Sequence, residues 1–160
     1  MSAMTVPFST GKLSVTRAIL WGGLVAGILD ATNGVVTYGI TGLNPIQVLR
    51  YIAGGLPGGR SFELGLAAVA LGTGLHFLIA YIAAAVYVLT TRRISSLNSL
   101  PAVFGALYGA AVFFFMNLVV LPYSAVTAAP FVLWMFIEGL IANALFVGVP
   151  IALYAERATS

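Results

Sequence analysis

The sequence of 160 residues contains no cysteine, a single histidine and few charged side chains. Without cysteine, the chain can form neither disulfides nor thiolate metal sites, and it has no cysteine nucleophile. Charged residues make up 7% of the chain and hydrophobic residues 61%, whereas soluble domains carry about 25% charged residues. A water-soluble globule of this composition would expose large apolar patches, so we expect the chain to fold in a lipid bilayer.

The formal net charge of +3 does not indicate a nucleic-acid partner. The seven Lys and Arg residues are scattered, and the longest basic run is Arg92-Arg93. A nucleic-acid-binding surface would gather such residues on one face or along one helix. The partner that the composition predicts is the lipid bilayer.

Four apolar stretches are long enough to cross a bilayer, which takes about 20 helical residues. Pro101 and Pro130 suit the first turns of the third and fourth helices, where a missing backbone N–H costs nothing. Pro122 suits the end of the third helix, and Pro150 is expected to kink the fourth near Phe146. We therefore predict one all-α transmembrane domain over residues 1–160, a four-helix bundle. Its spans are residues 17–38, 62–90, 101–122 and 131–154.

Most positive side chains fall on one side of the membrane if the four helices alternate in direction. Five lie on the side of both termini, and two, Arg50 and Arg60, lie on the other. Since Lys and Arg favour the cytoplasmic side, we predict a multi-pass plasma-membrane protein with both termini cytoplasmic. The first span is expected to be retained rather than cleaved as a signal peptide, because Asp30 interrupts it and no small-x-small site follows. The five residues are Lys12, Arg17, Arg92, Arg93 and Arg157.

The connection between the first two spans predicts a short helix over residues 45–54. Asn44 suits its N-cap and Pro45 its first position, and Ile46, Leu49, Ile52 and Ala53 share one apolar face. An amphipathic helix in the outer interface, a re-entrant segment and a surface loop with a helical turn are all compatible with this pattern. The loop that follows resembles an anion cradle for a lipid headgroup, although a flexible turn anchored by an interfacial arginine is favoured. The residues of this loop are Gly58, Gly59, Arg60 and Ser61.

Small residues recur at helical spacing in three of the spans. Helices in lipid associate through close backbone approach, which small side chains permit. We expect these seams to hold a monomeric bundle together, with a homodimer as the alternative. They contain Gly23, Gly27, Gly34 and Thr37 in the first span, Gly65, Gly72, Ala80 and Ala83 in the second, and Gly105 and Gly109 in the third.

Ionisable and amide side chains are rare within the spans. At the bilayer centre an ionisable group costs about 2.5–3.5 kcal/mol on insertion scales. At ~1.5 Å per helical residue, Asp30 and Glu138 lie roughly 10–12 Å from the outer ends of their helices, with His76 and Asn117 at similar depths. These four side chains, together with the amides of Asn33 and Asn143, form the predicted intramembrane polar cluster: Asp30, Asn33, His76, Asn117, Glu138 and Asn143.

Such a cluster can be neutralised in three ways. Asp30 and Glu138 can share a proton, a protonated His76 can neutralise either of them, or each carboxyl can stay protonated and bond an asparagine. The favoured interpretation is a polar clasp, a set of hydrogen bonds that fixes the register of the helices. The alternative is a proton or cation site reached from the outer face.

No catalytic, metal or cofactor chemistry is indicated. HxxxH and ExxH spacings are absent, and a bis-histidine haem would require a dimer. The hydrolase motifs GxSxG and HExxH are absent as well. We therefore expect a protein that is not an enzyme and that holds no metal or cofactor.

Four stretches resemble a group of bacterial four-helix inner-membrane proteins and, distantly, the YagU-like family, which is linked to acid resistance. They are GGLVAGILDATNGVVTYGITGLNPIQVLRYIAGGLPGGRSFE, ALGTGLHFLIAYIAAAVY, ALYGAAVFFFMNLVVLP and VGVPIAL. The resemblance implies the fold and an inner-membrane location, and it places Asp30, His76 and Asn117 at typical polar positions of the group. A histidine often stands where this chain has Asn143, a departure that argues against a two-histidine metal or haem site.

Taken together, these patterns favour a structural or accessory membrane component, alone, as a homo-oligomer or within a larger membrane complex. A small proton- or ion-handling protein that uses Asp30, His76 and Glu138 is the first alternative. A binder of a lipid- or quinone-like ligand is the second, motivated by residues 58–61 and the ring-rich segment FFFMN.

Overall fold

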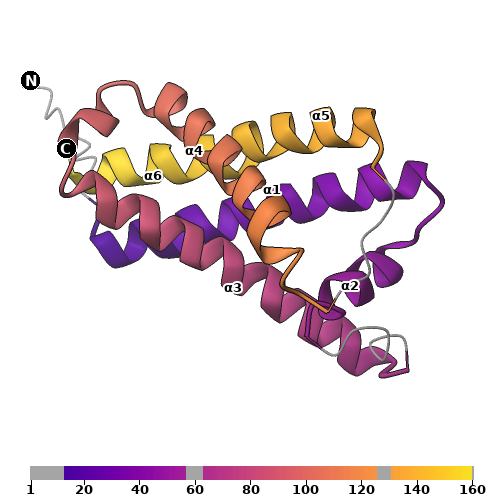
Figure 1. The fold of residues 1–160 in the computed structure, drawn as a ribbon. Helices are drawn as coiled ribbons and strands as arrows, with labels where there is room; N and C mark the ends of the chain where they lie inside the picture. Colours follow the sequence, from indigo (N-terminus) through magenta and orange to yellow (C-terminus); the bar gives the residue numbers. More distant parts are fainter. Residues whose placement is uncertain (1–12, 57–62, 126–130, 160) are drawn as a thin grey trace, which may run out of the picture.

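The computed structural model describes residues 13–56, 63–125 and 131–159. Within these ranges every regular element is a helix (Figure 1). In chain order they are α1 (Val15–Ile40), α2 (Pro45–Ala53), α3 (Leu66–Thr91), the 3-10 helix η2 (Ser95–Asn98), α4 (Pro101–Phe115), the π-helix η3 (Met116–Val120), α5 (Leu133–Ala142), the π-helix η4 (Asn143–Gly148) and α6 (Val149–Thr159).

Four helical segments are long and apolar enough to cross a membrane: Val15–Ile40, Leu66–Thr91, Pro101–Val120 and Leu133–Ala158. They confirm the four predicted spans. The second begins four residues later than predicted, because Gly65 has a φ of +56°, which no right-handed helix contains. Pro101 occupies the first turn of α4 as predicted, whereas Pro130 lies outside the described residues.

The core consists mainly of alanine, while large apolar side chains point outward. Ala26, Ala84 and Ala152 are fully buried, whereas Leu66 and Leu118 are 78% and 69% exposed. This distribution suits lipid, where close backbone contact holds helices together and leucine gains nothing by leaving the acyl chains. The four spans therefore form one bundle with an apolar outer surface.

The two ends of the described chain meet at one end of the bundle. The backbone N–H of Leu13, just before α1, donates to the carbonyl of Arg157 in α6 over 2.9 Å. The link η2 packs against α6 at the same end, and α2 lies at the other end (Figure 1). The helices thus alternate in direction, as predicted. The described basic residues of the first end are Arg17, Arg92, Arg93 and Arg157; Lys12 and Arg60 lie outside the described residues.

Glycine brings the third and fourth spans into backbone contact. A Cβ atom on Gly148 of η4 would collide with the carbonyl oxygen of Gly105 in α4, and one on Gly109 would lie 2.8 Å from the Cα of Ala144. Such approaches are characteristic of GxxxG packing in membranes. The predicted role of Gly105 and Gly109 is therefore confirmed as a contact between spans within the bundle.

The glycine stripe of α1 is used over only part of its length. Gly23 packs on Tyr81 of α3 and Gly27 packs on Phe77, whereas a Cβ on Gly34 would meet no atom within 4 Å. Figure 1 shows the reason: α1 and α3 lie together at the end of the chain termini and diverge toward the end that holds α2. The bundle is therefore tight at one end and wedge-shaped at the other.

The short helix α2 occupies the open side of this wedge and packs against α3. Its N-cap is Asn44 as predicted: the Asn44 Oδ1 accepts from the backbone N–H of Gln47 over 3.0 Å, and the Gln47 Oε1 accepts from that of Asn44 over 2.8 Å. A Cβ on Gly72 of α3 would collide with the carbonyl oxygen of Leu49. The helix thus docks on α3 through its backbone rather than lying free in the interface.

Both π-helical segments fall within spans. In η4, the backbone N–H of Val149 donates to the carbonyl of Ala144, five residues earlier. Pro150 follows directly and cannot donate to Phe146, so α-helical bonding is already interrupted here. The predicted disturbance of the fourth span thus takes the form of a widened turn, which often accompanies functional sites.

Candidate functional site

His76 lies on α3 and is bonded to the backbone of α1. Its Nε2 is 2.8 Å from the carbonyl oxygen of Gly27. A carbonyl only accepts hydrogen bonds, so Nε2 carries the hydrogen and donates it. The adjacent Phe77 packs on Gly27, and its ring meets the imidazole edge-on at 5.4 Å between centroids. The close approach of α1 and α3 at Gly27 therefore orients the imidazole.

Glu138 lies on α5 and is bonded to the side chain of Asn33 on α1. The Nδ2 of Asn33 donates to the Oε1 of Glu138 over 2.7 Å. Both side chains are half-buried. This hydrogen bond joins the first span to the fourth, 105 residues further along the chain.

Asp30 lies between these two contacts along α1. It stands three residues after Gly27 and three before Asn33, so it is a surface neighbour of each. Its carboxyl interacts electrostatically with both His76 and Glu138. We refer to Asp30, Asn33, His76 and Glu138, four of the six predicted residues, as the polar cluster. Hydrogen bonds join Asn33 to Glu138 and His76 to the backbone of α1, and Asp30 stands between Gly27 and Asn33 in α1.

The other two predicted residues bond within their own helices. The Nδ2 of Asn117 donates to the carbonyl of Phe113 over 2.9 Å, and that of Asn143 donates to Gly139 over 3.1 Å. Among the described residues, no hydrogen bond joins either amide to the polar cluster. Both asparagines belong to π-helices, so their side chains bond carbonyls of the preceding turn, beside a disturbed stretch of backbone.

The predicted headgroup loop of Gly58, Gly59, Arg60 and Ser61 lies outside the described residues. The part of the chain that the structure describes contains no group of three or more His, Asp or Glu residues that could hold a metal ion. What the polar cluster can do chemically is donate and accept hydrogen bonds and exchange protons among two carboxyls and one imidazole.

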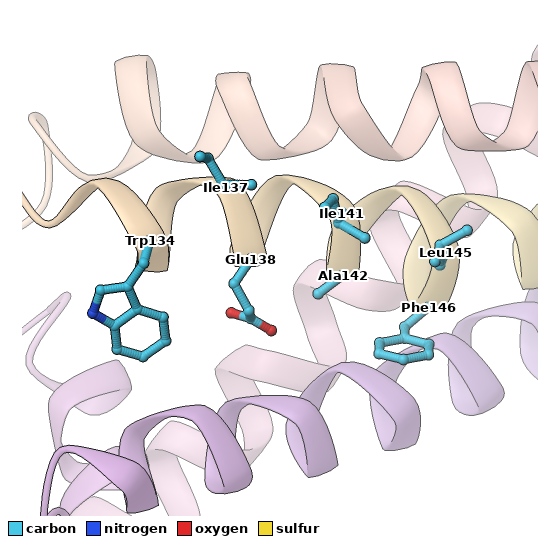
Figure 2. Close-up of a pocket in the computed structure, with 7 residues that line it drawn as sticks. All are labelled: Trp134, Ile137, Glu138, Ile141, Ala142, Leu145 and Phe146. Atoms are coloured by element: carbon cyan, nitrogen blue, oxygen red, sulfur yellow. The ribbon is translucent and has the colours of Figure 1, made fainter.

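An open groove adjoins the polar cluster on α5 and η4. Its volume is about 400 Å³, and Glu138 is its only ionisable lining residue. Figure 2 shows the side chains of Trp134, Glu138 and Phe146 on the face that points toward α1. Ile141 and Leu145 continue the lining along the helix. The carboxyl of Glu138 is thus bonded to Asn33 and also borders an apolar space.

Sequence reasoning missed this groove. The signal for it was present, because Trp134 precedes Glu138 by four residues and Ile141 and Leu145 follow by three and seven, a spacing that puts all four on one helix face. It also missed a second bond between spans, in which the hydroxyl of Tyr108 on α4 donates to the carbonyl of Ala83 on α3 over 2.8 Å.

Comparison with known proteins assigns this chain to no family and gives the polar cluster no known role. The resemblance to the YagU-like family stays a prediction from the sequence stretches that suggested it. The chain matches no family model, no curated protein and no solved structure.

Proposed function

We propose that this chain is a non-enzymatic structural or accessory protein of the bacterial inner membrane, with both termini cytoplasmic, whose polar cluster acts as a clasp. The observation that carries the proposal is the 2.7 Å hydrogen bond between Asn33 and Glu138. Together with the bond from His76 to Gly27, it ties α5 and α3 to the same two turns of α1. Small-residue seams slide and rotate easily, and polar side chains select one register among those that the seams allow.

A double-mutant cycle tests the clasp. Asn33→Ala, Glu138→Ala and the double variant are unfolded by denaturing detergent from a mild micelle. Hydrogen bonds between membrane helices contribute about 0.6 kcal/mol on average and about 1.7 kcal/mol at most, so we expect a coupling energy in that interval. The matched control pairs Asn117→Ala with Glu138→Ala; since Asn117 bonds its own helix, their effects should add. A coupling energy of zero between Asn33 and Glu138 contradicts the clasp.

A second candidate function is proton or ion handling. The observation that favours it is the position of Glu138, which belongs to the polar cluster and also lines an open groove. A carboxyl used only as a clasp would be enclosed and paired at both oxygens. Glu138 has one bonded oxygen, Oε1, while no hydrogen bond to Oε2 is found among the described residues. This carboxyl therefore has an oxygen that is available for a proton or a cation.

Reconstituted liposomes that contain a pH-sensitive dye test the second candidate. If the protein conducts protons, Glu138→Gln and Asp30→Asn should each reduce the flux at least about tenfold, because an amide cannot carry the exchanged proton. Asn117→Ala should leave the flux unchanged. Proton and cation fluxes equal to those of empty vesicles, at every gradient, rule this function out.

A further inference from the structure

The groove on α5 and η4 has the lining of a binding site for an organic cation. Glu138 lies near its middle, with Trp134 four residues before it and Phe146 eight residues after it on the same face (Figure 2). Trp134 is 46% exposed and Phe146 36%, so both rings are open to a ligand. Aromatic faces attract cations, tryptophan most strongly.

The charge at the groove favours a cation over an anion or a neutral lipid. The polar cluster contains two carboxyls and one imidazole, so its acidic groups outnumber its basic one. One oxygen of Glu138 is bonded to Asn33, and the other has no hydrogen-bond partner among the described residues. An acyl chain would fill the apolar part of the groove and leave this carboxyl oxygen without a partner, at a cost in free energy.

The volume of the groove and its apolar lining limit the size and the polarity of the ligand. A volume of about 400 Å³ is at the small end of ligand sites, and it fits an ion with a few rings or short alkyl chains. Apart from Glu138, every lining residue is apolar or aromatic. Because the groove is open and its lining belongs to a membrane-spanning segment, the ligand would enter from the bilayer and must itself dissolve in lipid.

We propose that this groove binds a lipophilic organic cation, an ammonium or phosphonium ion with aromatic or alkyl substituents. The positive charge lies at the free oxygen of Glu138, one helical turn from the ring of Trp134. The apolar substituents lie along Ile141 and Leu145. The proposal is independent of the clasp, because it uses the carboxyl oxygen that Asn33 does not occupy.

Tetraphenylphosphonium is the probe, and tetraphenylborate, which has nearly the same shape and the opposite charge, is its control. Binding of each ion to the full chain in lipid nanodiscs is measured by equilibrium dialysis. We expect the phosphonium to bind saturably and the borate to bind only as it does to empty nanodiscs. Equal binding of the two ions, or no saturable phosphonium binding, overturns the proposal.

Variants locate the bound ion. Glu138→Gln should weaken phosphonium binding at least about tenfold, because it removes the charged partner from a desolvated pair, whereas Glu63→Gln, the same chemical change at an exposed residue, should have no effect. Trp134→Leu should weaken binding about two- to fivefold.

Leu145→Trp provides a second test that does not depend on whether Glu138→Gln folds. It fills the groove, keeps the carboxyl and should abolish binding. Unchanged binding in Leu145→Trp or in a folded Glu138→Gln contradicts the proposal. A lost coupling energy between Asn33 and Glu138 would refute only the clasp.

Discussion

The ionisable side chains of the polar cluster each have a different kind of partner within the membrane-spanning bundle. His76 donates to a backbone carbonyl, Glu138 accepts from an amide, and Asp30 interacts electrostatically with both ionisable neighbours. A carbonyl in an α-helix has a second lone pair to offer, so the bond from His76 leaves the backbone bonding of α1 intact. The imidazole can therefore be held in place while its other nitrogen, Nδ1, remains available for a proton.

We predict that His76→Leu destabilises the bundle by about 0.6 kcal/mol, and by no more than about 1.7 kcal/mol, because it removes the donor to Gly27. His76→Gln should retain most of the stability, since its amide N–H can donate to the same carbonyl. The measurement is unfolding of the purified protein by denaturing detergent.

Asn117→Leu is the control for this comparison, because the amide that it removes bonds only its own helix. Its stability should change less than that of His76→Leu. If His76→Leu proves as stable as His76→Gln, the hydrogen bond to Gly27 contributes nothing measurable to the fold.

Depth along the helices predicts that Asp30, His76 and Glu138 belong to one region of the bundle; the hydrogen bonds described here join Glu138 to Asn33 and His76 to the backbone of Gly27. An ionisable side chain in lipid needs a polar partner, so three such side chains at one depth are expected to interact with one another or with nearby backbone carbonyls. Depth alone does not predict that Asn33 bonds another helix while Asn117 and Asn143 bond their own. An asparagine can bond its own helix instead, and the sequence spacing is the same in either case.

At the scale of elements, glycine decides which helices touch. Gly72 allows the backbone of α2 to reach α3, while a Cβ atom on Gly74, two residues later, would meet no atom of another element within 4 Å. The two glycines look alike in the sequence and differ only in the direction that they face. This pair therefore offers a matched comparison.

We predict that Gly72→Val detaches α2 from α3, because the added side chain collides with the carbonyl of Leu49. The chain contains no cysteine, so Ala53→Cys places a single thiol at a fully buried site of α2. Overpacking of this kind costs about 1–3 kcal/mol, so maleimide should modify this thiol about tenfold faster in the Gly72→Val background. The measurement is the rate of the maleimide reaction in native membranes.

Gly74→Val is the control and should leave this rate unchanged. Equal rates in the Gly72→Val and Gly74→Val backgrounds would show that the position of α2 does not depend on Gly72.

The regular parts of the elements were predictable, and the irregular parts were not. Span lengths, the Asn44 cap and Pro101 follow from composition and local rules. The start of α3 was placed four residues too early, because the hydrophobic run does not reveal the positive φ of Gly65. The π-helices escaped prediction for a similar reason: Pro150 marks where bonding must change, but not whether the helix bends or widens.

At the scale of the whole molecule, charge and geometry together give a topology. Arg17, Arg92, Arg93 and Arg157 belong to the end where α1 begins and α6 ends, and Arg50 belongs to the other. The surface between the ends is apolar, with exposed leucines on every span. Such an excess of arginine favours the cytoplasm for the first end.

From the proposed inner-membrane location and orientation, we predict that Ser95→Cys, in η2, is modified by a membrane-impermeant maleimide only after the membrane is permeabilised. Glu63→Cys, near the opposite end, should be modified in cells with an intact inner membrane. Both residues are exposed, and the absence of native cysteine removes background labelling. The reverse pattern would invert the orientation while leaving the fold as described.

The widened turn of η4 has a consequence for the whole fourth span. An α-helix rotates by about 100° per residue, and the i−5 bond from Val149 to Ala144 accommodates one more residue than an α-helical turn would. Deleting a single residue between Asn143 and Gly148 would restore ordinary α-helical winding, and Glu138 would keep its direction relative to α6, because the widened turn already absorbs the extra residue. A deletion in the α-helical segment between Glu138 and Asn143 would instead rotate the acid by about 100° away from Asn33. The widened turn is therefore the place where this span tolerates a change of length without moving the carboxyl.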